Sequence, residues 1–309
     1  MAQTDVDLLI LGAGPAGLSA AQYGSRANLR TLAVEQLAPG GQALSIDRLE
    51  NYPGELSPRS GYDFAEAMRR QAEGFGAEIV GDEALALRRE GELFIAALGS
   101  GREIRACAVI LATGAAHRNL GIPGEAEYTG RGVSYCATCD GPFFKGKRIL
   151  VVGGGDAACD EARFLSLLSD QVILVHRRGA FRAQAGLVQR ALENPRIEVR
   201  LNTRPLEIRG GKQVSSVWLE NTVTHEGREE PVDAVFIFAG TVPRTALVPD
   251  AETDGSGYII TDQRMASSIP GLFAAGDVRS SPFRQVVVAA SEGAIAAHCA
   301  AAYIDGLKP

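Results

Sequence analysis

Two closely spaced cysteines carry the most reactive side chains in the sequence. Cys136 and Cys139 form a C-x-x-C motif, and Asp140 follows directly. Two thiols at this spacing can close a small disulfide ring, and a neighbouring carboxyl group could donate or accept the proton that thiol–disulfide exchange needs. A closed structural zinc site needs about four ligands, and the sequence has no second C-x-x-C motif or nearby His-Cys pair. The motif therefore favours redox chemistry, with two ordinary core cysteines as the alternative.

The remaining cysteines and the histidines carry no comparable pattern. Cys107, Cys159 and Cys299 lie among apolar or small residues without a close partner in sequence, which is typical of buried thiols. The histidines do not stand at a metal-ligand spacing with another ligand, so we predict no metal site.

A glycine-rich turn near the N-terminus predicts a nucleotide site. Gly12, Gly14 and Gly17 form a G-x-G-x-x-G motif directly after an apolar run. Such glycines let the backbone approach a pyrophosphate, whose charge meets the N-terminal amides of the next helix. Glu35 ends the following β-prone run, where a carboxylate can accept hydrogen bonds from the ribose diol of an adenosine nucleotide. A glycine-rich turn without a ligand is the alternative for the motif alone.

A second copy of this pattern has basic residues at the position where the first copy has Glu35. Gly153 and Gly155 follow the apolar run 148–152, and the next predicted strand ends in the basic sequence 176–178. Guanidinium groups meet a 2'-phosphate with bidentate hydrogen bonds, whereas a carboxylate would repel it. We therefore predict a nucleotide with a free 2'-hydroxyl at the first turn and NADP at the second. A solvated basic cluster is the alternative.

These residues require two βαβ units joined by two crossings. The first unit covers residues 7–35, and the second begins at residue 148. The apolar runs 108–116 and 232–243 each end in a turn, and we interpret them as the crossings between two domains. The other predicted elements are a helix over 63–74, a β-meander within 91–110, strands at 258–261 and within 271–278, and a helix within 283–304.

Length, charge and hydrophobic patterning indicate which classes of protein this chain can belong to. The 309 residues allow about two domains. The chain has 31 basic and 37 acidic residues, a net charge of -6, without one long basic run, so nucleic acid is not an expected partner. No stretch reaches the roughly 18 consecutive apolar residues of a membrane span, and the N-terminus is acidic where a secretion signal would be basic. We predict a cytoplasmic protein without membrane association.

Over nearly its whole length the chain resembles the low-molecular-weight, bacterial-type thioredoxin reductases. The motifs that carry the resemblance are GAGPAG (12–17), APGGQ (38–42), ENYPG (50–54), ATGA (112–115), CATCD (136–140), GGGDAA (153–158), HRRGAFRA (176–183), FAAGDV (273–278) and FRQ (283–285). The resemblance implies an α/β fold with two Rossmann-like, three-layer ββα nucleotide-binding domains, the second inserted in the first. It implies an FAD-binding domain over 1–114 and 244–309, and an NADPH-binding domain over 115–243 that carries the redox disulfide.

The resemblance also assigns roles by position. It implies that Cys139 faces the flavin, that Cys136 attacks the protein substrate, and that Asp140 is the acid–base group. Asp277 would bind the ribityl chain of FAD. The implied FAD residues are Gly12, Gly14, Pro15, Ala16, Glu35, Gly41, Gln42, Asn51, Thr113, Gly114, Asp277, Arg284, Gln285 and Val286. The implied NADPH residues are Gly153, Gly155, Asp156, Ala157, His176, Arg177, Arg178 and Arg182.

The expected activity is reduction of thioredoxin or a thioredoxin-like protein by NADPH, in a homodimer. Asp156 departs from the asparagine or serine often found there, and residues 240–243 (GTVP) replace the usual GH-x-P. Asp156 would weaken nucleotide binding unless it caps its helix and points away from the phosphates. The alternatives are the same flavin and disulfide chemistry supplied by ferredoxin or a second flavin, and a flavin-binding redox sensor, against which the intact CATCD motif argues.

Overall fold

A computed structural model describes residues 4–46, 49, 51–55, 57 and 59–307 of the chain. Its backbone divides into two compact units, one formed by residues 1–116 with 242–309 and the other by residues 117–241. Both boundaries lie two residues from those expected from the sequence. They fall within β7 (Ala115–His117) and β16 (Thr241–Pro243), which pair as a two-stranded sheet. Each unit is described by itself below.

A parallel sheet forms the centre of the first unit. Its strands follow the order β3-β2-β1-β6, and β17 pairs in parallel with the end of β6. The strands are β1 (Val6–Leu11), β2 (Thr31–Glu35), β3 (Glu78–Gly81), β6 (Glu103–Leu111) and β17 (Leu272–Ala274). A Rossmann-like sheet of this kind places its ligand-binding turns at the carboxyl ends of the strands.

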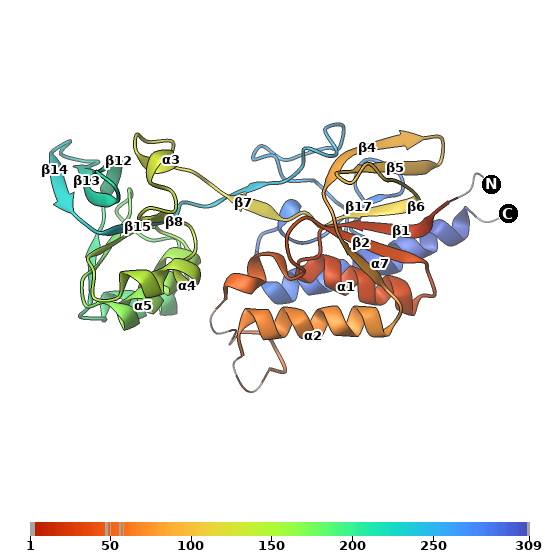
Figure 1. The fold of residues 1–309 in the computed structure, drawn as a ribbon, viewed down its shortest axis with the longest axis horizontal. Helices are drawn as coiled ribbons and strands as arrows, with labels where there is room; N and C mark the ends of the chain where they lie inside the picture. Colours follow the sequence, from red (N-terminus) through yellow and green to blue (C-terminus); the bar gives the residue numbers. More distant parts are fainter. Residues whose placement is uncertain (1–3, 47–48, 50, 56, 58, 308–309) are drawn as a thin grey trace. The chain divides into compact units, whose positions relative to one another are not determined.

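Two further layers cover the faces of this sheet. Side chains of β1 alternate between them: Leu8 and Ile10 pack toward the helices, whereas Leu9 and Leu11 pack toward the β-meander. Because both faces are buried, β1 is a continuous apolar run. Figure 1 shows the helices along one face and the meander on the other. The helices are α1 (Pro15–Arg26), α2 (Gly61–Gly74) and α7 (Val286–Gly306), and the meander is β4 (Ala84–Glu90), β5 (Leu93–Leu98) and the start of β6.

Helix α7 is apolar along most of its length. By length and composition alone it could cross a membrane, and it is the one helix in the described residues that passes this test. Half of its most apolar stretch is nevertheless buried within the first unit, where Ala296, Ala297 and Ala300 join the same core as Leu8 and Ile10 of β1. The core helix of a globular protein has the same composition, so this feature is weak evidence for a membrane span.

The second unit repeats the three layers. Its parallel sheet has the order β11-β10-β9-β15-β8, and a separate antiparallel sheet has the order β12-β13-β14. Figure 1 shows α5 and the β12–β14 sheet on opposite sides of this unit. The parallel strands are β8 (Val133–Ser134), β9 (Ile149–Gly153), β10 (Val172–Val175), β11 (Ile197–Arg200) and β15 (Ala234–Phe238). The antiparallel strands are β12 (Thr203–Gly210), β13 (Val214–Asn221) and β14 (Gly227–Pro231), and the helices are α3 (Glu125–Tyr128), α4 (Ala137–Asp140), α5 (Asp156–Leu168) and α6 (Ala185–Leu192).

The fold class predicted from the sequence is confirmed, and one predicted element is wrong. Residues 258–261 do not form a strand, because Ile259 makes only isolated bridges to Thr253 and Arg279. The Asp254 carboxylate accepts hydrogen bonds from the backbone amides of Ser256 and Tyr258, which holds the preceding residues in a turn. The C-terminal helix also begins at Val286 rather than nearer residue 283.

Candidate active site

The first glycine-rich turn leaves open space where a phosphate would bind. Gly12 and Gly17 are required by the fold itself, because a Cβ on either would lie 2.4 Å or less from a backbone oxygen. Gly14 has an ordinary φ of -70°, and a Cβ there would come no closer than 3.9 Å to its own chain, at Gly41. The fold does not explain this glycine, but a pyrophosphate at the N-terminus of α1 does. The turn therefore fits the pyrophosphate of FAD.

Glu35 lies beside this turn at the carboxyl end of β2. Its Oε2 accepts a hydrogen bond from the backbone amide of Ala13 at 2.7 Å, and its Oε1 accepts one from Leu37 at 3.2 Å. A carboxylate has about four acceptor positions, so two remain for a ribose diol. The side chain is thus held in place with acceptor capacity to spare.

Hydrogen bonds to distant parts of the first unit hold three other predicted flavin residues, and one of these bonds joins two of the predicted residues. The Asn51 side-chain amide donates to Gln285 Oε1 at 3.0 Å, and the Gln42 amide donates to the Ala115 carbonyl at 2.6 Å. Thr113 donates from Oγ1 to a backbone carbonyl at 2.7 Å. Glu50, which precedes Asn51 in the ENYPG motif, lies outside the described residues. Pro15 and Ala16 begin α1, Gly41 begins the 3-10 turn 41–45, Gly114 directly precedes β7, and Val286 begins α7.

Asp277 stands in a short 3-10 turn, Gly276–Val278, that follows β17. Burial raises the pKa of its carboxyl group, and the nearby Arg284 guanidinium opposes this rise. The Arg284 guanidinium carbon lies 3.9 Å from the centre of the Tyr258 ring, a cation–π contact. Arg284 Nε is also covered and has no hydrogen-bond partner in the described structure. This half-buried carboxylate and the half-buried arginine fit a polar ligand such as a ribityl chain.

Glu292 holds the turn that carries Asp277, and sequence reasoning missed it. Its Oε2 accepts a hydrogen bond from the Gly276 amide at 2.8 Å, and its other oxygen pairs with Arg279. Arg279 Nε donates to Thr261 Oγ1 at 2.7 Å. An acidic residue in the middle of the apolar α7 was the available signal, because a buried charge needs a partner.

Replacing Glu292 with glutamine is expected to destabilise the first unit and weaken flavin retention. The substitution leaves the Arg279 guanidinium buried without its counter-charge, which costs about 3–5 kcal/mol for pairs of this kind. Thermal unfolding, followed together with flavin release, measures the effect. Glu66→Gln on α2 is the control, because Glu66 pairs with Arg69 and Arg70 at the surface and its loss should change the melting temperature little. Equal melting of Glu292→Gln and wild type would contradict this role.

The second glycine-rich turn has the same design in the second unit. A Cβ on Gly153 would lie 2.6 Å from the Phe238 carbonyl oxygen, so this glycine serves the fold. Gly155 has φ -103°, and a Cβ there would meet nothing within 4 Å. Open space therefore lies at the N-terminus of α5. Asp156 and Ala157 are the first two residues of this helix. This turn fits the diphosphate of a nicotinamide nucleotide.

The basic residues that follow β10 divide into one buried side chain and three exposed ones. His176 is 7% exposed as a whole residue, and its ring packs against Gly154 and stacks on Phe181. Burial lowers its pKa, and the positive charges of the neighbouring arginines lower it further, so the ring is mainly neutral at pH 7. The charge that could meet a 2'-phosphate therefore comes from the exposed residues Arg177, Arg178 and Arg182. Sequence reasoning had grouped His176 with them.

The cysteine pair forms a disulfide in the second unit, with its Cα atoms 5.4 Å apart. It follows β8 and lies on α4. Cys136 Sγ accepts a hydrogen bond from the Cys139 amide at 3.2 Å and lies 3.4 Å from Thr138 Oγ1. Cys139 is exposed, and no hydrogen bond to its sulfur occurs in the described residues. The two sulfurs are therefore unequal, because the Cys139 amide donates to Cys136 Sγ and a donor in this position would favour a thiolate there.

Topology brings the disulfide and the second turn to one edge of the second unit. β8 and β9 are both parallel to β15, which lies between them. Cys136 follows the carboxyl end of β8, and Gly155 follows that of β9. Phe143, three residues after Asp140, is 80% exposed. A reactive disulfide, a nucleotide turn and an exposed aromatic side chain thus belong to one compact unit.

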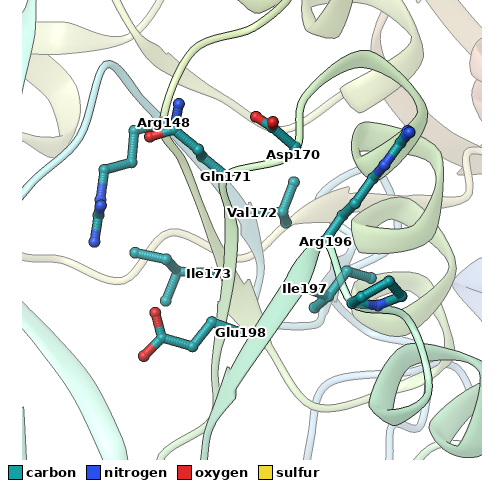
Figure 2. A pocket seen from close by; sticks show the side chains of 9 residues that line it. Arg148, Asp170, Gln171, Val172, Ile173, Arg196, Ile197 and Glu198 are labelled. Carbon is teal, nitrogen blue, oxygen red and sulfur yellow. The ribbon is translucent and has the colours of Figure 1, made fainter.

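A hollow of about 410 Å³ lies at the opposite, amino-terminal edge of the same sheet. Figure 2 shows Arg148, Asp170, Arg196 and Glu198 among its lining residues. It contains no cysteine and none of the predicted site residues. The described residues also contain no group of three or more His, Cys, Asp or Glu side chains that could hold a metal ion. The disulfide and the predicted nucleotide turn therefore lie at the other edge of the sheet, away from this hollow.

A redox disulfide on one of two dinucleotide-binding units defines a disulfide oxidoreductase that uses a flavin and a nicotinamide nucleotide. The family model described as pyridine nucleotide-disulphide oxidoreductase matches residues 6–293. A thioredoxin reductase of Treponema pallidum (strain Nichols) is 56% identical, and the match covers 99% of each chain. A thioredoxin reductase of Listeria innocua is 45% identical, with 98% of this chain and 95% of the relative covered. The solved thioredoxin reductase of Lactococcus lactis is 40% identical, with a TM-score of 0.94 over 98% of this chain and all of that one.

The chain therefore belongs to the pyridine nucleotide-disulphide oxidoreductase family, among the bacterial-type thioredoxin reductases. It is an FAD-dependent disulfide oxidoreductase, and this family uses FAD and NADPH.

Proposed function

We propose that this enzyme reduces thioredoxin, or a thioredoxin-like protein, with electrons from NADPH. The observation that carries the proposal is the disulfide at the same sheet edge as a glycine-rich turn flanked by exposed arginines. The side chains of Arg177, Arg178 and Arg182 make no hydrogen bond or ion pair within the described part of the chain, which leaves them for a ligand. This supports NADPH as the donor over ferredoxin or a second flavin. Bound FAD supplies the two-electron chemistry that links the nicotinamide to a disulfide.

The unequal sulfurs support Cys136 as the attacking group. In the reduced enzyme, the Cys136 thiolate attacks one sulfur of the substrate disulfide, forms a mixed disulfide and releases one substrate thiolate. The Cys139 thiolate then attacks Cys136 Sγ and releases the second substrate thiolate, which re-forms the enzyme disulfide. Asp140, adjacent in sequence, is proposed to give a proton to a departing thiolate.

Exposed aromatic side chains and the cysteines outside the disulfide support three further proposals: a protein substrate, a homodimer and a reducing compartment. The exposed Phe143 side chain, four residues after Cys139, gives a partner protein an apolar contact that a small disulfide would not need. Tyr23, Tyr62 and Phe75 are exposed on or just after α1 and α2, which supports a homodimer through the first unit. Cys159 and Cys299 are buried thiols outside the disulfide, which supports a reducing compartment such as the cytoplasm.

A thioredoxin-dependent assay tests this function. The purified enzyme is mixed with NADPH and oxidised thioredoxin, and NADPH consumption is followed against oxidised glutathione as the small-disulfide control. We expect rapid consumption with thioredoxin and little with glutathione. Equal rates with both would contradict a protein substrate.

Turnover is also expected to require rotation of the second unit about the crossings at 113–117 and 240–244. The nicotinamide turn and the disulfide both belong to this unit, yet both must exchange electrons with one flavin, and they would compete for the same space beside it. Gly114 and Gly240 lie in the crossings with φ of 66° and 108°, which suits them to backbone change. A cross-link that holds the disulfide against the flavin should therefore block reduction by NADPH in stopped-flow measurements. Reduction at the unlinked rate would show that no rotation is needed.

A further inference from the structure

Asp156 places a carboxylate at the first residue of α5, directly after the open space at Gly155. It does not cap its own helix, whose N-cap is Gly155. Its Oδ1 accepts a hydrogen bond from the backbone amide of Gln184 at 2.8 Å, and its Oδ2 accepts one from the Gln184 side-chain amide at 2.6 Å. Gln184 is the N-cap residue of α6. Both carboxylate oxygens are therefore directed to a segment 28 residues further along the chain.

That segment, residues 177–184, carries all three exposed arginines. It joins β10 to α6, and most of its side chains are exposed. At its start, the carbonyls of Arg177 and Arg178 accept hydrogen bonds from Thr222 Oγ1 and the Asn202 amide. Arg182 donates its backbone amide to the Gly154 carbonyl at 2.7 Å, and the His176 ring packs against Gly154 at the start of the segment. The Asp156–Gln184 contact fastens the other end. The position of the arginines relative to the glycine-rich turn thus depends on these attachments.

The same carboxylate could act in two opposite ways on a nucleotide. An unpaired acid beside a diphosphate would repel it and weaken the binding of every nucleotide equally. Here two donors occupy both oxygens, one of them the backbone amide at the start of α6. Charge-assisted hydrogen bonds of this kind are the stronger ones in proteins, so the contact can hold an exposed segment in place. Its effect should then fall on the 2'-phosphate, which only the arginines of the segment would recognise.

We propose that Asp156 is a positioning residue that fastens the segment 177–184 to the glycine-rich turn and so sets the preference for a 2'-phosphorylated nucleotide. This proposal rests on the proposed NADPH site.

The test uses two probes that differ in the 2'-phosphate, adenosine 2',5'-bisphosphate and 5'-AMP, titrated calorimetrically into the flavin-loaded enzyme. Asp156→Ala should weaken binding of the bisphosphate about tenfold or more and leave 5'-AMP within about twofold. Gln184→Ala, which keeps the backbone amide, should weaken the bisphosphate by a smaller factor. Asp160→Ala is the matched control, because this exposed acid lies one turn along α5 and pairs only with Arg163 among the described residues. It should bind both probes like wild type.

Asp156→Ala should also raise KM for NADPH while kcat at saturating NADPH stays unchanged, which a general loss of folding would not produce. Tighter binding of both probes by Asp156→Ala would overturn the proposal and show that the carboxylate acts by repulsion. Equal weakening of both probes, or no change in either, would overturn it as well. Wild-type enzyme that binds the two probes equally would overturn the proposed NADPH site itself, and the positioning role with it.

Discussion

Replacement of Cys136 or Cys139 by serine is expected to abolish thioredoxin reduction, a loss of about a thousandfold or more. Exchange needs both sulfurs: one to form the mixed disulfide and one to resolve it. A serine hydroxyl cannot do either at neutral pH. Flavin reduction by NADPH should survive in both variants, because it needs the nucleotide turn and not the thiols.

The two half-reactions separate this prediction from general damage to the fold. Stopped-flow absorbance measures flavin reduction by NADPH, and the thioredoxin assay measures exchange. Cys159→Ser is the control, because Cys159 is a buried thiol of α5 in the same unit, where burial raises its pKa to about 11. It should retain both half-reactions. Substantial thioredoxin reduction by Cys136→Ser or Cys139→Ser would contradict the assigned chemistry.

The double substitution of Arg177 and Arg178 by alanine is expected to raise KM for NADPH by about 100-fold or more. Each charge-assisted hydrogen bond to the 2'-phosphate contributes about 1.5–3 kcal/mol, and two such bonds correspond to at least this factor. KM for NADH should change by less than about threefold, since NADH lacks that phosphate. Steady-state kinetics with both nucleotides measures the ratio.

The control for this pair is Arg190→Ala, which removes an exposed arginine from α6 in the same unit. It should leave both KM values unchanged, because α6 follows the segment that carries the phosphate-binding arginines. An equal rise in KM for NADH and NADPH in the double variant would show that Arg177 and Arg178 do not recognise the 2'-phosphate.

Local patterns in the sequence predicted the fold because each βαβ unit is encoded within about 30 residues. The apolar run of β1, the glycines after it and the acid at Glu35 are close in sequence, and so are their counterparts around Gly153. The contrast between Glu35 and the arginines after β10 is likewise visible without a structure. Motif spacing was sufficient wherever the interacting groups are neighbours along the chain.

Contacts between distant segments were not predictable in this way. Glu292 holds the Asp277 turn from another element, and Gln184 reaches Asp156 across 28 residues. His176 continues a basic sequence, yet the direction of its side chain at the end of β10 buries it against Gly154. Residues 258–261 have the composition of a strand but lack a partner strand. These features depend on tertiary packing, which a short pattern does not encode.

Anaerobic titration of the purified flavin-loaded enzyme with NADPH tests the central claim most directly. The flavin absorbance should bleach rapidly at stoichiometric NADPH and return when oxidised thioredoxin is added. Absence of bleaching with NADPH would contradict the account and favour an enzyme supplied by another electron donor.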